Sequence, residues 1–133
     1  MKKSAIVAGL LLVLIGASAA RAAEIDVVST TTVNLRAGPA VSFPAVSYIP
    51  AGSHLVLYGC VAGYSWCDIS WGRERGWVAA TYLTTLYRSA PIPITGIAAA
   101  RIGIRVVAFD AGYWQRYYVG RPWYPRRRYY GVW

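Results

Sequence analysis

The chain has 133 residues, with 14 lysines and arginines against five acidic residues, so its net charge is +9 at pH 7. This length allows one small domain with an additional segment and excludes an assembly of several domains. One histidine and two cysteines are too few for a typical zinc site of four protein ligands.

Residues 1–22 form a predicted signal peptide. Two lysines precede an apolar run from Ala5 to Ile15, and small residues follow it. The run is short for a membrane span and is typical of an export signal; an uncleaved anchor and a buried helix are the alternatives. We expect cleavage after Ala22 or Ala23 and a periplasmic or secreted protein.

Removal of the signal peptide changes the composition. The remaining chain contains eleven arginines, five acidic residues and no lysine. A basic exported protein meets anionic envelope polymers, acidic lipid headgroups or acidic partners, so we expect no nucleic-acid partner.

Short strands are predicted between Val33 and Leu83, because short alternating apolar and polar runs are separated by Gly, Pro and Ser. Residues 23–32 form a lead-in rich in β-branched residues, and residues 33–84 form the predicted domain. The predicted strands lie near residues 31–36, 45–49, 53–60, 64–71 and 74–79.

The rest of the chain is less regular. Residues 85–96 contain Pro91 and Pro93, which predicts a linker or an edge segment. Residues 97–109 are predicted to form a strand or a strand pair. They begin a C-terminal extension, residues 97–133, that ends in a tail of aromatics and arginines with little periodicity.

Cys60 and Cys67 are the only cysteines and favour a disulfide in an oxidising compartment, with free thiols as the alternative. His54 cannot complete a zinc site with them. Redox pairs usually have C-x-x-C spacing, and a catalytic cysteine needs an oriented base. We therefore expect no metal and no cofactor.

The predicted domain closely resembles the bacterial Src-homology-3-like (SH3b) domain. The matching motifs are, in order, "NLR-GP" at residues 34–39, "FP" at 43–44, "P-G" at 50–52, Trp66, "GWV" at 76–78 and "YL" at 82–83. The resemblance implies an all-β fold, a small SH3-like barrel of about five short strands. It also implies a module that binds rather than catalyses, often on peptidoglycan or its peptides. The apolar residues expected inside this barrel are Leu35, Val46, Leu55, Leu57, Ile69 and Val78.

The two cysteines raise a question of register. If Cys60 lies opposite Cys67 with Gly63-Tyr64 at the hairpin tip, regular pairing puts Leu57 and Ile69 on different faces. Both are expected inside the barrel. An extra residue at Gly59 or near Gly63, a β-bulge, removes the conflict.

Several aromatic and arginine residues are candidates for a ligand surface. Tyr64 and Trp66 either line a groove near the hairpin tip or pack inside, and arginines either bind carboxylates or are neutralised by Asp68 and Glu74. The candidate ligand-binding residues are Arg36, Tyr48, Tyr64, Trp66, Arg73 and Arg75.

The tail is a second candidate surface. Its aromatics are expected to pack partly on the barrel while its triple arginine stays free for an anionic lipid or glycan. The segment Pro122–Arg127 also has the P-x-x-P form that eukaryotic Src-homology-3 domains bind, so self-docking is an alternative. The candidate tail residues are Trp123, Tyr124, Arg126, Arg127 and Arg128.

The predicted function is that of a non-catalytic binding module of the cell envelope that recognises peptidoglycan, its peptides or an envelope protein. The alternative is a protein-interaction or anionic-surface adhesion factor that acts through the tail. An enzyme is not expected, because the chain has one histidine and no Ser-His-Asp spacing.

Overall fold

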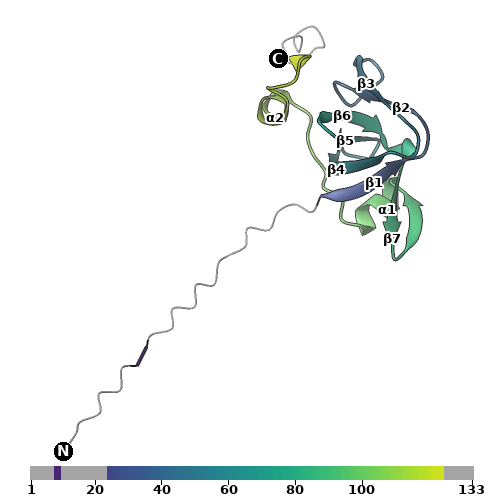
Figure 1. Ribbon diagram of the computed structural model, residues 1–133, viewed down its shortest axis with the longest axis vertical. Coiled ribbons are helices and arrows are strands. Elements are labelled where there is room, and N and C mark those ends of the chain that lie inside the picture. The colour runs from purple at the N-terminus through teal and green to yellow at the C-terminus, as the bar shows by residue number, and fades with distance from the viewer. Residues whose placement is uncertain (1–7, 10–23, 125–133) are drawn as a thin grey trace, which may run out of the picture.

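A single eight-stranded antiparallel sheet dominates the fold (Figure 1). The computed structural model describes residues 8–9 and 24–124, so almost all of the predicted signal peptide lies outside the described residues. The strands follow one another in the sheet in the order β3-β2-β6-β5-β4-β1-β7-β8. Their bounds are β1 Ile25–Ser29, β2 Val33–Arg36, β3 Ala45–Ile49, β4 His54–Cys60, β5 Trp66–Trp71, β6 Glu74–Ala79, β7 Leu83–Tyr87 and β8 Ala90–Pro93.

The all-β fold class is confirmed, and the sheet is larger than the predicted five strands. Strands β2 to β6 coincide with the five predicted ones, whereas β1, β7 and β8 extend the sheet on the far side of β4. The two outer strands, β3 and β8, do not pair with each other in the described part of the chain. The sheet is therefore strongly wrapped but open, and not a closed barrel.

The larger core cluster contains buried side chains from all the strands β1 to β7. Five of the residues expected inside are buried, and the sixth, Val46, is half-buried and packs against them. The predicted alternation is correct because side chains of a strand point to opposite faces with a period of two. The buried five are Leu35, Leu55, Leu57, Ile69 and Val78.

The predicted bulge is present, at Tyr58, the residue before the predicted position Gly59, and not near Gly63. Leu57 pairs with Ile69, but Gly59 pairs with Asp68 and Cys60 with Cys67, so Tyr58 is one residue too many on β4. The predicted disulfide joins Cys60 to Cys67, whose Cα atoms are 4.0 Å apart. The extra residue lets both the core side chains and the bridge occupy their proper faces.

The segment predicted as a linker or edge segment forms the outer hairpin of the sheet. Strand β8 contains Pro91 and Pro93 and pairs only with β7. Proline lacks the N–H that a strand with two neighbours would use, so an edge position suits this sequence.

Residues 97–109 do not form the predicted strand or strand pair. The helix α1, Gly96–Arg101, covers the first part of this range, and in a short stretch after it Val106 forms a parallel bridge with Cys60. Three successive alanines, residues 98–100, explain the helix, because alanine has the highest helix propensity. An apolar run this short does not distinguish a strand from a helix by its pattern.

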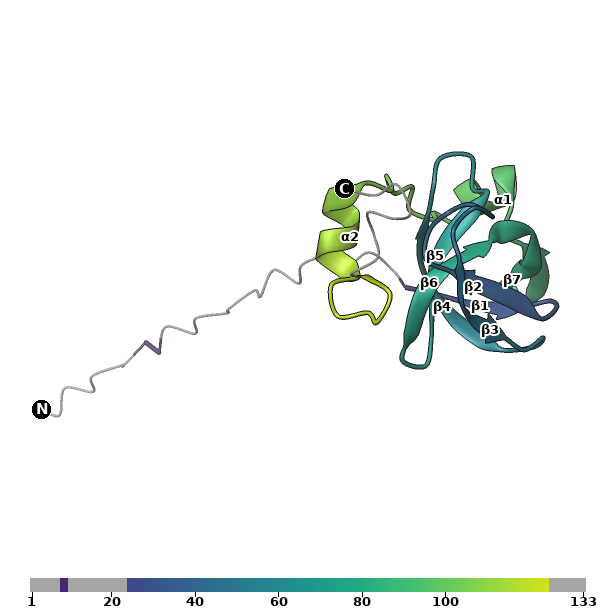
Figure 2. The ribbon, with the colours of Figure 1, turned by 90° about the horizontal axis from the view of Figure 1, so that it is seen from above.

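A second helix, α2, spans Ala111–Tyr117 within the tail. The side chain of Asp110 accepts a hydrogen bond of 2.7 Å from the backbone N–H of Tyr113 and caps this helix. Figures 1 and 2 show α2 beside the sheet and well separated from α1, which lies next to β7. In the described ranges, no helix is long and apolar enough to span a membrane.

Candidate ligand-binding site

The candidate site is built around Asp68, a completely buried carboxylate on β5. Arg75 of β6 binds it with both ends of its guanidinium group, with Nε 3.1 Å from Oδ1 and Nη2 2.7 Å from Oδ2. Asp68 pairs across the sheet with Trp77, so Arg75, two residues earlier, lies diagonally opposite on the same face. The alternative that Asp68 neutralises an arginine is correct for Arg75.

The C-terminal extension completes the coordination of this carboxylate. The hydroxyl groups of Tyr113 and Tyr118 both donate hydrogen bonds to Asp68, the latter to Oδ1 at 2.5 Å. Tyr113 lies on α2 and Tyr118 directly follows it. Because four donor atoms reach one carboxylate, we call Asp68, Arg75, Tyr113 and Tyr118 the Asp68 cluster.

The ionisation of the cluster is fixed by its burial. Burial, together with the charge of and hydrogen bond to Asp68, raises the pKa of Tyr113 and of Tyr118 well above the usual 10.0. Burial lowers the pKa of Arg75, but the hydrogen bond and the charge of Asp68 outweigh this effect and raise the pKa overall. Both phenols therefore stay protonated and the guanidinium stays charged at neutral pH.

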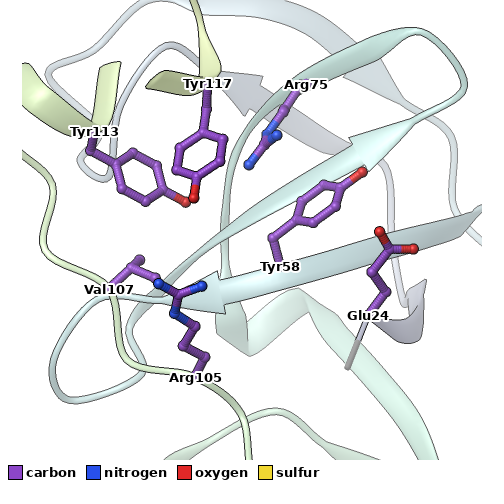
Figure 3. A pocket seen from close by; sticks show the side chains of 7 residues that line it. All are labelled: Glu24, Tyr58, Arg75, Arg105, Val107, Tyr113 and Tyr117. Carbon is purple, nitrogen blue, oxygen red and sulfur yellow. The ribbon is translucent and has the colours of Figure 1, made fainter. Parts of the chain in front are cut away.

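A pocket of about 240 Å³ lies directly above the cluster (Figure 3). The guanidinium carbon of Arg75 lies 4.1 Å from the ring centre of Tyr58 and 4.6 Å from that of Tyr117, so two rings flank the cation. The tyrosines come from β4 and α2, which meet only in the folded chain. The pocket is lined by Glu24, Tyr58, Arg75, Arg105, Val107, Tyr113 and Tyr117.

The backbone of Cys60 positions one wall of the pocket. Its N–H donates to the carbonyl of Arg105 at 2.9 Å, and its carbonyl accepts from the N–H of Val107 at 2.8 Å. Gly59 is also needed, since a Cβ built at this position would lie 2.7 Å from a methyl carbon of Val107. The disulfide hairpin thus holds the exposed side chain of Arg105 at the rim.

The pocket presents one exposed charge of each sign at its rim. Asp68 neutralises Arg75, whereas Arg105 and Glu24 are exposed at the rim. Guanidinium groups bind carboxylates, and tyrosine rings pack against sugar rings or peptide side chains. The chemistry suits a ligand with a carboxylate, an amino group and an apolar body. No cluster of His, Cys, Asp and Glu that would hold a metal ion exists in the described part of the chain.

Of the six predicted ligand-binding residues, only Arg75 lines this pocket. Arg36 donates to the carbonyl of Phe43 at 2.9 Å and supports its own loop. Tyr48 and Arg73 are exposed elsewhere, on β3 and in the turn before β6. The structure therefore does not gather the six residues into one surface.

Tyr64 and Trp66 are both half-buried, and they pack against different clusters of side chains. Tyr64 packs against the core inside the sheet, and Trp66 packs against the aromatic cluster beneath α2. The hairpin tip has the expected place, because Gly63 and Tyr64 both have positive φ, 83° and 56°.

Part of the tail packs on the domain. Trp123 lies 5.2 Å from Trp114, ring centre to ring centre, and Tyr124 lies 6.1 Å from it. Arg121 donates a hydrogen bond to the carbonyl of Arg73. The predicted free residues Arg126, Arg127 and Arg128, and the second half of the segment Pro122–Arg127, lie outside the described residues.

Sequence reasoning missed Tyr58, Arg105 and Tyr117 as pocket residues. A local signal existed only for Arg105, since a charged residue interrupts an apolar run there. Tyr58 and Tyr117 can be recognised as pocket residues only once the structure shows that β4 and α2 lie together.

Comparison with known families now identifies the central segment. Residues 31–84 match the sequence profile of the bacterial SH3 domain. This segment is a bacterial SH3 domain. Bacterial SH3 domains are in general binding modules of the cell-wall type, and such a domain with a disulfide indicates a location outside the cytoplasm.

The match does not extend to the whole site. Arg105, Tyr113, Tyr117 and Tyr118 follow the bacterial SH3 domain, and Glu24 precedes it. Neither the curated proteins nor the solved structures include a match to the chain. The pocket is thus formed jointly by the bacterial SH3 domain and its flanking segments.

Proposed function

We propose that the protein is a non-catalytic, exported binding module of the bacterial cell envelope. Its ligand is peptidoglycan or one of the stem peptides of peptidoglycan. Cleavage of the signal peptide after Ala22 or Ala23 leaves the module in the periplasm or outside the cell. The ligand binds in the pocket above the Asp68 cluster.

The observation that carries this proposal is the pairing of charges with rings in one pocket. Arg105 and Glu24 stand at its rim, and three tyrosines line its walls. Stem peptides carry both carboxylates and an amino group, and they are linked to sugars. The exposed arginine binds a carboxylate, the exposed glutamate binds the amino group, and the rings cover the apolar part.

Arg105 rather than Arg75 supplies the attraction for the ligand. The charge of Arg75 is already compensated by Asp68 at 2.7 Å. Arg75 instead presents a fixed planar surface between Tyr58 and Tyr117. Such an immobilised wall reduces the entropy that binding would otherwise cost.

The packing of the tail favours this function over adhesion through the tail. Trp114 and Tyr118 are completely buried, and Trp123 packs on both of them. These rings are occupied within the protein. The adhesion function would then depend on Arg126, Arg127 and Arg128.

A pull-down with purified sacculi tests the proposal. We expect the exported protein to bind sacculi at low and at high salt, and Arg105→Gln to weaken binding about tenfold, as loss of a charged hydrogen bond does. Arg73→Gln removes the same charge from an exposed turn and serves as the matched control. Purified stem peptide added in excess should compete.

Two results would contradict the proposal. Absence of binding at both salt concentrations excludes a peptidoglycan ligand. Binding at low salt alone, with equal losses for Arg105→Gln and Arg73→Gln, shows attraction by net charge without a specific pocket.

A further inference from the structure

A second concave surface lies between the β7–β8 hairpin and α1, and the function above does not use it. Its volume is about 310 Å³. Figures 1 and 2 show α1 and β7 close together and away from α2. We call this surface the hairpin slot; it is lined by Tyr87, Ile92, Ile97, Ala98, Arg101 and Ile102.

The hairpin slot combines apolar walls with positive charge. Arg101 is its only charged lining residue, and the guanidinium carbon of Arg88 lies 5.3 Å from the ring centre of Tyr87. None of the five acidic residues of the chain lines the slot. A ligand that is complementary to this surface must therefore carry negative charge next to apolar groups.

The tight turn between β7 and β8 carries one of these cations. Arg88 and Ser89 have φ values of 49° and 66°, so two successive residues adopt the left-handed conformation of a tight primed turn. Both residues are exposed. This turn places the backbone of Arg88 at the end of the β7–β8 hairpin, and its guanidinium lies beside the ring of Tyr87.

The helix α1 contributes a large apolar side chain to the same surface. Ile97 is 75% exposed, and Arg101 follows it four residues later, so both lie on one side of the helix. Exposed apolar residues beside arginines are the arrangement that interfacial membrane-binding segments use.

We propose that the hairpin slot docks on an anionic lipid bilayer. Arg88 and Arg101 bind lipid phosphates, while Ile97 and the ring of Tyr87 enter the boundary between headgroups and acyl chains. The charge complementarity decides in favour of a lipid surface, since Arg101 lines the slot, Arg88 lies next to its residue Tyr87, and no carboxylate lines it. This proposal is independent of the sacculus ligand and uses none of the residues that line the pocket above Asp68.

Vesicle co-sedimentation tests the proposal. The protein is recovered from the periplasm of an expressing bacterium, with its N-terminus read by mass spectrometry, and is mixed with vesicles of phosphatidylcholine alone or with equal parts of phosphatidylglycerol. We expect binding only when phosphatidylglycerol is present. The double variant Arg88→Gln/Arg101→Gln should lower the partition coefficient roughly 25-fold, since each arginine near an anionic surface contributes roughly fivefold.

Two matched controls distinguish docking through the hairpin slot from attraction by the net charge of the protein and from binding by any exposed apolar residue. Arg73→Gln/Arg116→Gln removes the same charge from exposed positions outside the slot and should lower the partition coefficient much less. Ile97→Asn should weaken binding several-fold, whereas Val41→Asn should not, although Val41 is 76% exposed and thus equally accessible.

Three outcomes would overturn the proposal. The first is no binding to vesicles that contain phosphatidylglycerol. The second is an equal loss for the two double arginine variants, which indicates net charge alone. The third is loss of binding only in Arg126→Gln/Arg127→Gln/Arg128→Gln, which assigns the lipid contact to the tail instead.

Discussion

Asp68 is the residue on which the architecture of the site depends. Its carboxylate is completely buried and joins Arg75 on the next strand to two tyrosines that lie 45 and 50 positions later in the chain. A buried charge is tolerable only when it is paired and hydrogen-bonded. Asp68 therefore works as the attachment point of the C-terminal extension and not as a ligand-binding group.

Replacement of Asp68 should be strongly destabilising. Asp68→Asn leaves the largely buried Arg75 without its counter-ion, and breaking a buried pair in this way costs about 3 kcal/mol or more. Urea unfolding followed by tyrosine and tryptophan fluorescence measures the loss. Glu74→Gln, on an exposed neighbouring position, should stay within about 0.5 kcal/mol. An equally small effect of Asp68→Asn would show that the cluster contributes little.

The raised pKa values of Tyr113 and Tyr118 predict a loss of stability in alkali. Above the unfolded-state pKa of 10.0, the unfolded chain releases the two phenol protons while the folded chain retains them. The folded state then binds more protons, so the free energy of unfolding falls as pH rises, by up to about 1.4 kcal/mol per pH unit for each phenol.

Unfolding free energies measured at several pH values above neutrality test this expectation. The double variant Tyr113→Phe/Tyr118→Phe should show a flatter decline, because it has no phenol protons to lose at these positions. Parallel declines in the variant and the original protein would show that the two phenols are not the cause.

At the scale of elements, the disulfide hairpin acts on a segment outside it. Cys60 is bonded to Cys67 by sulfur and to Arg105 and Val107 by its backbone. The bridge therefore restrains β4, β5 and one wall of the pocket together. The two cysteines therefore have a structural function, and neither of these two described cysteines has a free thiol.

Removal of the disulfide should reduce stability and loosen the pocket wall. Closing a loop of eight residues stabilises by about 2.5 kcal/mol on the chain-entropy formula. Cys60→Ala/Cys67→Ala should lower the unfolding free energy by about this amount and speed hydrogen exchange at the Val107 N–H. Exchange at the Ile94 N–H, bonded to Leu83 away from the bridge, is the internal reference. An unchanged exchange rate at the Val107 N–H would show that the disulfide does not restrain the pocket wall.

At the scale of the whole molecule, the C-terminal extension is part of the folded unit. Trp114 and Tyr118 are completely buried, and they pack in one cluster with Trp77 of the bacterial SH3 domain. A binding assay on a chain without residues 111–133 would therefore not isolate the function of the tail. It would also remove two of the hydrogen-bond donors of Asp68.

Truncation should consequently affect folding. A chain ending at residue 110 exposes Trp77 and the Asp68 carboxylate, and small domains are stable by only about 5 kcal/mol or slightly more. We expect it to lose its cooperative thermal transition, as measured by near-ultraviolet circular dichroism. Arg126→Gln/Arg127→Gln/Arg128→Gln keeps the packed residues and should retain the transition. An unchanged midpoint after truncation would support the predicted division into separate segments.

The local structure of the bacterial SH3 domain could be predicted from its sequence. Alternation, glycine and proline predicted β2 to β6, because the side-chain period of a strand is two and these residues mark its ends. The same period required a bulge near Cys60, since the core leucines and the bridge otherwise conflict. These properties depend on neighbouring residues, and they are readable without a tertiary structure.

The helices of the C-terminal extension and the pocket could not be predicted, because they depend on contacts between distant segments. The alanine run of α1 and the short α2 carry no periodic pattern that separates helix from strand. The pocket joins Tyr58, Arg105 and Tyr117 from three distant segments, and the two tyrosine partners of Asp68 follow it by 45 and 50 positions. Such contacts arise from packing and from the need to satisfy a buried charge, which no local pattern in the sequence records.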